Sequence, residues 1–282
     1  MSIKYRLWSL LFIIPVMMFT VSCSTRIEFT TKEENFALLP VDTAFEFVRQ
    51  IYEEIDFYGE FQPFDLELTE AYRRSYFQLI NLDRYLIDDS RQRNYYFDEF
   101  DNAYGLTHMP DSYNPANYTY YFFDMTGNGT PDLGINTGRV PHLITYCKDQ
   151  DEFSLLYWTT WRTRILGSNK LALIGERDFW FIEIDENSDE VYTIQFFLDG
   201  RYDENGEGIQ IYFLGIPENS NIPENIRYDL IFRESTGLYY LEVTDEQWNQ
   251  LVGSFFNSLE LARENIESVT YTYEELFGDF IY

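Results

Sequence analysis

The chain has 282 residues, of which 20 are Lys or Arg and 48 are Asp or Glu, so its formal net charge at pH 7 is −28. A chain this acidic is repelled by nucleic acid phosphates, and we expect no nucleic acid partner. Because 45% of the residues are hydrophobic and 19% are aromatic, an intrinsically disordered chain is excluded. The length is sufficient for a core that needs no disulfide.

The first 22 residues have the pattern of an export signal. Lys4 and Arg6 precede a largely apolar run over residues 7–21, and the small Ser22 follows. At about 1.5 Å per residue the run is too short for a bilayer core of about 30 Å. The pattern therefore favours a cleaved signal peptide over a permanent transmembrane anchor.

The segment Thr20-Val21-Ser22-Cys23 resembles a bacterial lipobox, with Thr20 where Leu is usual. The resemblance implies that signal peptidase II cuts before Cys23 and that this cysteine carries acyl chains. Two acyl chains anchor a protein stably on a membrane, whereas a single acyl chain binds only reversibly. The implied location is extracytoplasmic, on the bacterial cell membrane; the alternative is an ordinary secretory signal with a chance cysteine.

Only one other cysteine, Cys147, is present, so no intramolecular disulfide is expected once Cys23 is lipidated. Cys147 ends a mostly apolar run over residues 143–147. This context predicts a buried small hydrophobe rather than a nucleophile.

Residues 23–40 form a polar stretch that we interpret as a tether, and residues 41–282 as a single α+β domain. Its helical part covers residues 41–117. Thr43 and Glu46 fit a capping box for a helix that stops near Gly59, and a second helix is expected over residues 68–88.

The β-rich part, residues 118–243, contains short runs of aromatic and β-branched residues separated by turn residues. Nine strands are expected, at residues 119–123, 142–148, 153–160, 171–174, 179–184, 191–198, 209–214, 228–232 and 238–243. Most connections are too short for helical crossovers, which predicts a mainly antiparallel meander.

The last part, residues 244–282, begins with Thr244 and Gln247, which fit a second capping box. A long amphipathic helix is expected after it. Residues 269–273 are expected to form an edge strand.

A glycine-rich loop between two apolar runs carries oxygen-bearing side chains at alternate positions. Asp124, Thr126 and Asn128, the carbonyl of Thr130 and the side chain of Asp132 are the predicted ligands of a Ca²⁺ ion, which prefers oxygen. With two carboxylates, the expected dissociation constant is about 10⁻⁴–10⁻³ M. The alternative is a bare two-residue type I′ turn at Asn128-Gly129, which needs no metal.

The spacing of this loop resembles the first nine positions of an EF-hand and the shorter loops of integrin-type and VCBS-type repeats. Ile135 stands where an EF-hand has its bidentate Glu, so the shorter loop is the better match.

The same segment, residues 120–135, is similar to one found in uncharacterised extracytoplasmic lipoproteins of Firmicutes. A second segment that is similar to one in these lipoproteins is Val269-Thr270-Tyr271-Thr272-Tyr273-Glu274-Glu275-Leu276-Phe277. The resemblance implies helices before a β-rich middle and a C-terminal helix, but no established activity.

No local pattern indicates a catalytic site, and neither His108 nor His142 lies in a zinc or nucleophile motif. Residues 203–207 fit either a second cation loop or a plain turn. Trp158, Trp161 and Arg162 are a candidate ligand-binding surface, with packing of an edge strand as the alternative.

Together these patterns predict a cell-surface lipoprotein of unknown specific role, with no catalytic motif, a structural Ca²⁺ loop and an unidentified glycan or protein partner. The alternative is a surface protein that binds or cleaves carbohydrate.

Overall fold

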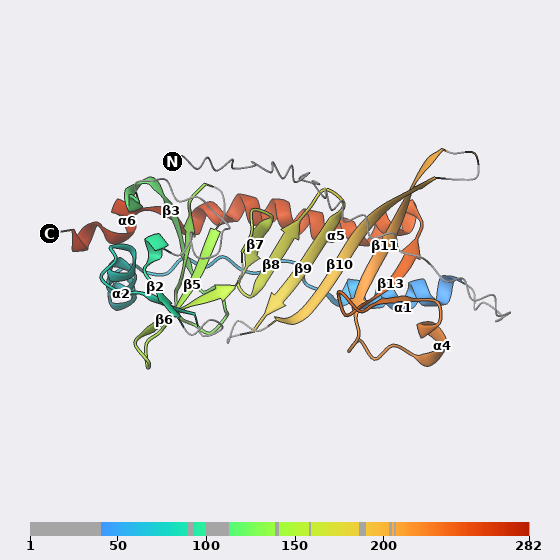
Figure 1. The fold of residues 1–282 in the computed structure, drawn as a ribbon, viewed down its shortest axis with the longest axis horizontal. Helices are drawn as coiled ribbons and strands as arrows, with labels where there is room; N and C mark the ends of the chain where they lie inside the picture. Colours follow the sequence, from blue (N-terminus) through green and yellow to red (C-terminus); the bar gives the residue numbers. More distant parts are fainter. Residues whose placement is uncertain are drawn as a thin grey trace, which may run out of the picture. The chain divides into compact units, whose positions relative to one another are not determined.

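Two seven-stranded sheets form the framework of the described part of the chain in the computed structural model (Figure 1). The structure describes residues 41–88, 93–99, 113–138, 141–157, 159–185, 190–202, 205 and 207–281. The predicted signal peptide, Cys23 and the tether lie outside these residues. Among the described helices, none has the length and apolarity that crossing a membrane requires.

The first sheet has the strand order β14-β3-β4-β5-β6-β1-β2. Its neighbours are antiparallel except β1 and β6, which are parallel. The strands are β1 (Leu86–Asp88), β2 (Arg93–Tyr95), β3 (Thr119–Phe123), β4 (Asp132–Asn136), β5 (Pro141–Cys147), β6 (Glu152–Tyr157) and β14 (Thr270–Thr272).

The second sheet has the order β12-β13-β11-β10-β9-β8-β7 and is antiparallel throughout. The strands are β7 (Thr163–Gly167), β8 (Lys170–Ile174), β9 (Asp178–Ile184), β10 (Glu190–Tyr202), β11 (Gly208–Pro217), β12 (Ile231–Arg233) and β13 (Leu238–Val243).

Helices pack against both sheets: α2 and α6 contact the first sheet, and α1 and α5 contact the second (Figure 1). The helices are α1 (Val41–Glu54), α2 (Glu70–Ile80), α4 (Glu224–Arg227), α5 (Asp245–Asn265) and α6 (Tyr273–Phe277), with short 3-10 turns η1 (Pro115–Asn117), η2 (Ile266–Val269) and η3 (Gly278–Phe280). The predicted mixed α+β class is confirmed.

The expected single meander is divided between the two sheets. The chain leaves the first sheet after β6 and enters the second at β7, through a turn in which the Thr160 N–H donates to the Thr163 hydroxyl at 2.8 Å. Four of the described strands were not expected: β4, β7, and the short pair β1 and β2. The β1 strand lies within residues 68–88, where a helix was predicted.

Local capping patterns are confirmed at one helix and wrong at another. The Thr244–Gln247 capping box forms at the start of α5 as predicted. Thr43, in contrast, lies inside α1, which begins at Val41, and Glu46 pairs with Arg49 instead. The predicted second helix ends at Ile80, because Leu82 adopts a left-handed φ of 66° that a helix cannot continue through.

Aromatic residues fill the cores on both sheets. On the second sheet, the ring of Phe57 contacts those of Phe181 and Phe255 edge-on, at centroid distances of 5.1 and 5.6 Å. A second cluster joins the first sheet to α2 and α6 through Tyr76, Phe122 and Phe277, which are fully buried. The 19% aromatic content is therefore used largely for packing.

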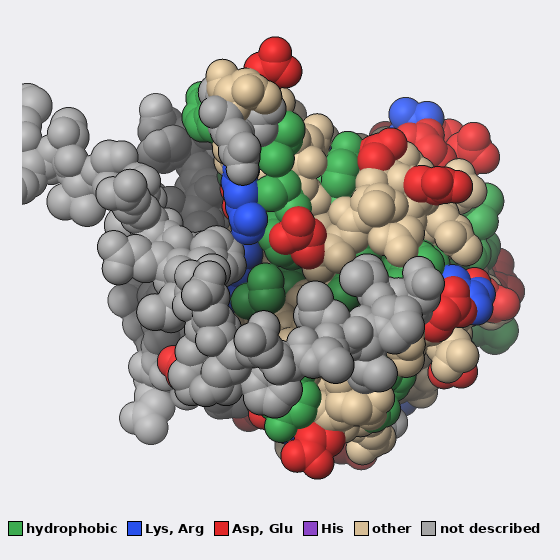
Figure 2. Space-filling model, turned by 90° about the vertical axis from the view of Figure 1, so that its right-hand side faces the viewer, with side chains coloured by type: hydrophobic (Ala, Val, Ile, Leu, Met, Phe, Trp, Pro, Cys, Tyr) green, Lys and Arg blue, Asp and Glu red, His purple; other side chains and the backbone are tan. Residues whose placement is uncertain are grey.

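The opposite face of the second sheet is shielded by arginine. Phe213 and Tyr240 are fully buried there, and the Arg233 guanidinium lies 4.7 Å from the Tyr240 ring centroid and 4.9 Å from that of Phe197. A cation over an aromatic face is favourable and also covers it. The side of the molecule drawn in Figure 2 likewise has a stripe of basic side chains beside hydrophobic ones.

A close backbone contact joins Gly59, in the segment after α1, to Gly167 at the end of β7. The Gly59 N–H donates to the Leu166 carbonyl at 2.9 Å, and a Cβ at Gly167 would lie 2.0 Å from the Gly59 carbonyl oxygen. Gly167 also has a φ of +123°, which side chains rarely adopt. Only glycine fits this position.

Cys147 does not have the predicted environment. Its thiol is exposed, because β5 ends at this residue and the chain turns back toward Glu152. The prediction of a buried cysteine was wrong, since a run of apolar neighbours does not reveal where a strand leaves the core.

Candidate metal centre

The candidate Ca²⁺ loop connects β3 to β4 across residues 124–131. Phe123 pairs with Asp132 as the last rung of the ladder, so the strands are joined by a long loop. The alternative of a two-residue turn at Asn128-Gly129 is therefore wrong. Gly127 and Gly129 have φ values of +74° and +84°, which let the loop fold back on itself.

Asp124 accepts hydrogen bonds from the backbone of its own loop. Its Oδ2 accepts from the Gly129 N–H at 2.6 Å, and its Oδ1 accepts from the Asn128 N–H at 3.1 Å. These bonds place a carboxylate at the centre of the turn that the glycines permit.

Asp132 is fully buried at the start of β4. Its Oδ2 accepts from the Met125 N–H at 2.9 Å and the Thr126 N–H at 3.2 Å. No group within the described residues makes a hydrogen bond to its Oδ1, although the nearby Thr145 hydroxyl helps to lower the pKa. Burial is the larger effect and raises the pKa of Asp132 to about 7.

The two carboxylates converge on the hydroxyl of Thr126. Thr126 Oγ1 lies 3.4 Å from Asp124 Oδ1 and 3.3 Å from Asp132 Oδ2. Both contacts are long for a hydroxyl donor, which has only one proton to share. The negative charge of Asp124 also raises the pKa of Asp132. Two acidic groups thus face the same hydroxyl oxygen.

Asn128 and Thr130 lie farther out. Asn128 Oδ1 accepts from the Thr130 N–H at 2.8 Å and from the Thr130 hydroxyl at 2.6 Å, so the amide oxygen already has two donors. Across the described part of the chain, no three His, Cys, Asp or Glu side chains form a metal-binding group. A Ca²⁺ shell here would therefore combine two carboxylates with neutral oxygens.

The loop is supported from the second sheet, which the sequence did not indicate. The Asn169 N–H donates to the Met125 carbonyl at 2.6 Å, and the Ser168 hydroxyl donates to the Asp124 carbonyl. Both residues belong to the turn between β7 and β8. The loop that carries the five predicted ligands is thus fixed by the β3–β4 ladder at its ends and by hydrogen bonds from the β7–β8 turn.

No protein-family model, curated protein or solved structure matches this chain. The function must therefore be inferred from the residues themselves.

Two residues of the second predicted site, Trp161 and Arg162, are described. Trp161 is 66% exposed, but the Arg162 guanidinium is held by Asp178, whose Oδ2 lies 2.7 Å from Nη2 and also accepts from the Trp180 indole at 3.1 Å. Arg162 thus has an internal partner for its charge. Trp158 lies outside the described residues.

Of the two histidines, only His142 lies within the described residues. His142 is 4% exposed and packs edge-on against the Phe97 ring at 5.6 Å. Burial lowers the pKa of His142 to about 4, so it is neutral at pH 7. His108 and most of residues 203–207 lie outside the described residues.

Proposed function

We propose that the protein is a lipoprotein of the bacterial cell surface, attached through Cys23, whose Asp124–Asp132 loop binds Ca²⁺ as a structural ion. The observation that carries the metal half is the convergence of Asp124 and Asp132 on the Thr126 hydroxyl, together with the buried Asp132 Oδ1 that accepts no hydrogen bond from the described residues. A buried carboxylate oxygen without a donor is costly, and a cation removes that cost.

The chemistry of the loop fits a hard cation. Asp124 and Asp132 would supply charge, and the side chains of Thr126 and Asn128 with the Thr130 carbonyl would supply neutral oxygens. Because the loop joins β3 to β4 and contacts the β7–β8 turn, bound Ca²⁺ would stiffen the junction of the two sheets. The role is structural, and no catalytic step is part of the proposal.

The proposed kinship with extracytoplasmic lipoproteins of Firmicutes rests on the loop segment and on residues 269–277. It includes the expected order of helices, antiparallel strands and a C-terminal amphipathic helix. In support, α5 buries Trp248, Leu251, Val252, Phe255 and Ala262.

Thermal unfolding in the presence of Ca²⁺ and in the presence of a chelator tests the proposed Ca²⁺ binding. A ligand that binds only the folded state stabilises it by about 2.7 kcal/mol at one hundred times its Kd. We expect Ca²⁺ to raise the Tm of the wild type but not of Asp124→Asn, which keeps the shape and removes the charge. Asp149→Asn, in the exposed turn after β5, is the matched control and should respond like the wild type. An equal Tm in Ca²⁺ and chelator contradicts the proposal.

Metabolic labelling with a palmitate analogue tests the anchor. We expect incorporation into the wild type and into Cys147→Ser, but not into Cys23→Ser. Label that depends on Cys147 would overturn the assignment.

A further inference from the structure

A cavity of about 440 Å³ lies beside the metal loop, where the two sheets meet. Its walls come from Asp124 and Gly129 of the loop, from the segment that follows α1, and from the β7–β8 turn. This volume is within the range of small-molecule sites.

The walls are fixed by backbone hydrogen bonds. The Ser168 N–H donates to the Glu60 carbonyl at 3.0 Å, next to the Gly59–Gly167 contact described above. Asn169, at a φ of +55°, is also tied to the metal loop through its N–H. A pocket with such walls is largely formed before a ligand arrives, which lowers the entropic cost of binding.

Acidic side chains outnumber basic ones at the cavity, and each of them already has a hydrogen-bond donor. Lys170 Nζ donates to Asp56 Oδ2 and to the Tyr58 carbonyl, each at 2.9 Å. The carboxylate of Glu60 accepts from the Gln62 side chain, and that of Asp124 accepts from its loop. Three carboxylates and one paired lysine line the cavity, so an anion would be repelled. A neutral polyhydroxyl ligand can use the same carboxylates as hydrogen-bond acceptors, and a cationic ligand is tested below as the competing outcome.

The free polar group in this cavity suits hydroxyls. No hydrogen bond to the Asn169 carboxamide is formed within the described residues, and a carboxamide both donates and accepts. The carboxylates around it keep lone pairs for hydroxyl donors. The half-buried rings of Tyr58 and Phe64 supply apolar surface on the same walls.

We propose that this cavity binds a neutral carbohydrate of one or two rings, with the Asn169 carboxamide as a specificity-determining contact. The site differs from the Trp161-Arg162 surface that the sequence indicated. It does not depend on calcium, but Asp124 is shared, so metal and sugar should affect each other's affinity reciprocally if both bind.

The test is isothermal titration of the full chain, in a detergent without a sugar headgroup, with glucose, galactose, N-acetylglucosamine, maltose and cellobiose, and with putrescine as a cationic comparison. Each is tested in Ca²⁺ and in chelator. We expect saturable binding of at least one sugar, weakened about tenfold by Asn169→Gly, which removes the carboxamide and tolerates the positive φ.

Asn221→Gly is the matched control, because Asn221 also has a positive φ (52°) and lines a neighbouring cavity. It should bind sugar as the wild type does. Asn169→Asp is the second variant if the glycine variant fails to fold; it keeps the acceptor, loses the donor and should also weaken binding.

Absence of binding by every sugar in both buffers overturns the proposal, as does unchanged binding by both Asn169 variants. Loss caused by Asn221→Gly alone places the ligand in the neighbouring cavity, and binding of putrescine without any sugar indicates a cation site; either result also overturns it. The Tm shift with Ca²⁺ is measured without sugar, so failure of the metal proposal is distinguishable.

Discussion

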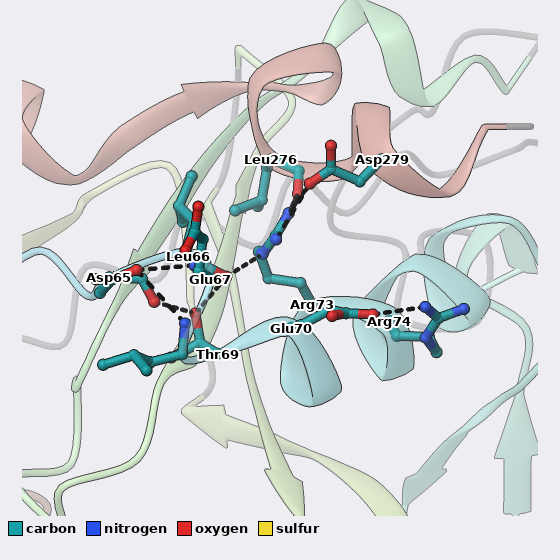
Figure 3. Close-up of polar contacts among 10 residues, drawn as sticks. Asp65, Leu66, Glu67, Thr69, Glu70, Arg73, Arg74, Leu276 and Asp279 are labelled. Atoms are coloured by element: carbon teal, nitrogen blue, oxygen red, sulfur yellow. Dashed lines mark hydrogen bonds and ion pairs between the residues drawn. The ribbon is translucent and has the colours of Figure 1, made fainter.

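The guanidinium of Arg73 donates a hydrogen bond of 2.8 Å to the carbonyl of Leu276, 203 residues further along the chain (Figure 3). The same side chain, only 4% exposed, donates to the Leu66 carbonyl at 2.9 Å and lies 3.3 Å from Asp279. Arg73 therefore joins the start of α2 to the C-terminal segment.

Arg73→Met should lower the free energy of unfolding by about 2–4 kcal/mol, because two main-chain carbonyls lose a charged donor. Denaturant unfolding measures the change. Arg74→Met is the control: this neighbour pairs with Glu70 at 2.6 Å, and both side chains are more than half exposed. Its removal should cost about 0.5 kcal/mol or less. Equal losses in the two variants would contradict the role of Arg73.

Gly129→Ala should lower the free energy of unfolding by about 1 kcal/mol, because its φ of +84° is strained for any residue with a Cβ. A Cβ there meets no atom within 4 Å, so the cost is conformational. Gly253→Ala, in the middle of α5, also meets no atom and should raise stability by up to about 1 kcal/mol. Opposite signs in chemical denaturation are the expected outcome, and a neutral Gly129→Ala would argue against this turn.

His142 should make stability fall as the pH is lowered. Its pKa in the folded protein is about 4, below the ordinary histidine value of 6.5, so the unfolded chain takes up a proton first as the pH falls through 6.5. The contribution is complete above pH 6.5 and is lost towards pH 4, with a total of about 3 kcal/mol.

The measurement is the difference in free energy of unfolding between pH 7 and pH 4, compared between the wild type and His142→Gln. Between pH 7 and pH 4, the free energy of unfolding of His142→Gln should fall by about 3 kcal/mol less than that of the wild type. The wild type alone is not sufficient, because the raised pKa of Asp132 makes the fold more stable as the pH falls over the same range. Asp132 is present in both proteins, so its effect cancels in the difference between them. Parallel pH profiles would show that the fold does not disfavour the charged imidazole.

Cys147 should react with a maleimide in the native protein, since its thiol is exposed at the end of β5. Mass spectrometry should find one added group on the chain without Cys23, and none after Cys147→Ser. Modification that needs denaturant would restore the prediction of a buried side chain.

Local signals in the sequence predicted elements whose determinants lie within them. The aromatic runs at Thr119–Phe123 and Leu238–Val243 coincide with β3 and β13, and Thr244 with Gln247 marks the start of α5. The division into two sheets could not be predicted in this way, because it depends on where the chain after Tyr157 finds its next pairing partner.

The candidate metal loop shows the same limit. The spacing of Asp124 and Asp132 identified the loop, but not the burial of Asp132 or the hydrogen bond from Asn169. These depend on the β7–β8 turn, which approaches from the other sheet. The cavity had no local signal either, since its walls come from three separate segments.

The approach of Gly59 to Gly167 leaves no room for a side chain between the two backbones. Separating the segment after α1 from the end of β7 breaks main-chain hydrogen bonds on both sides of this contact at once. We therefore expect the cavity and the β3–β4 loop to be lost together, in one cooperative unfolding transition.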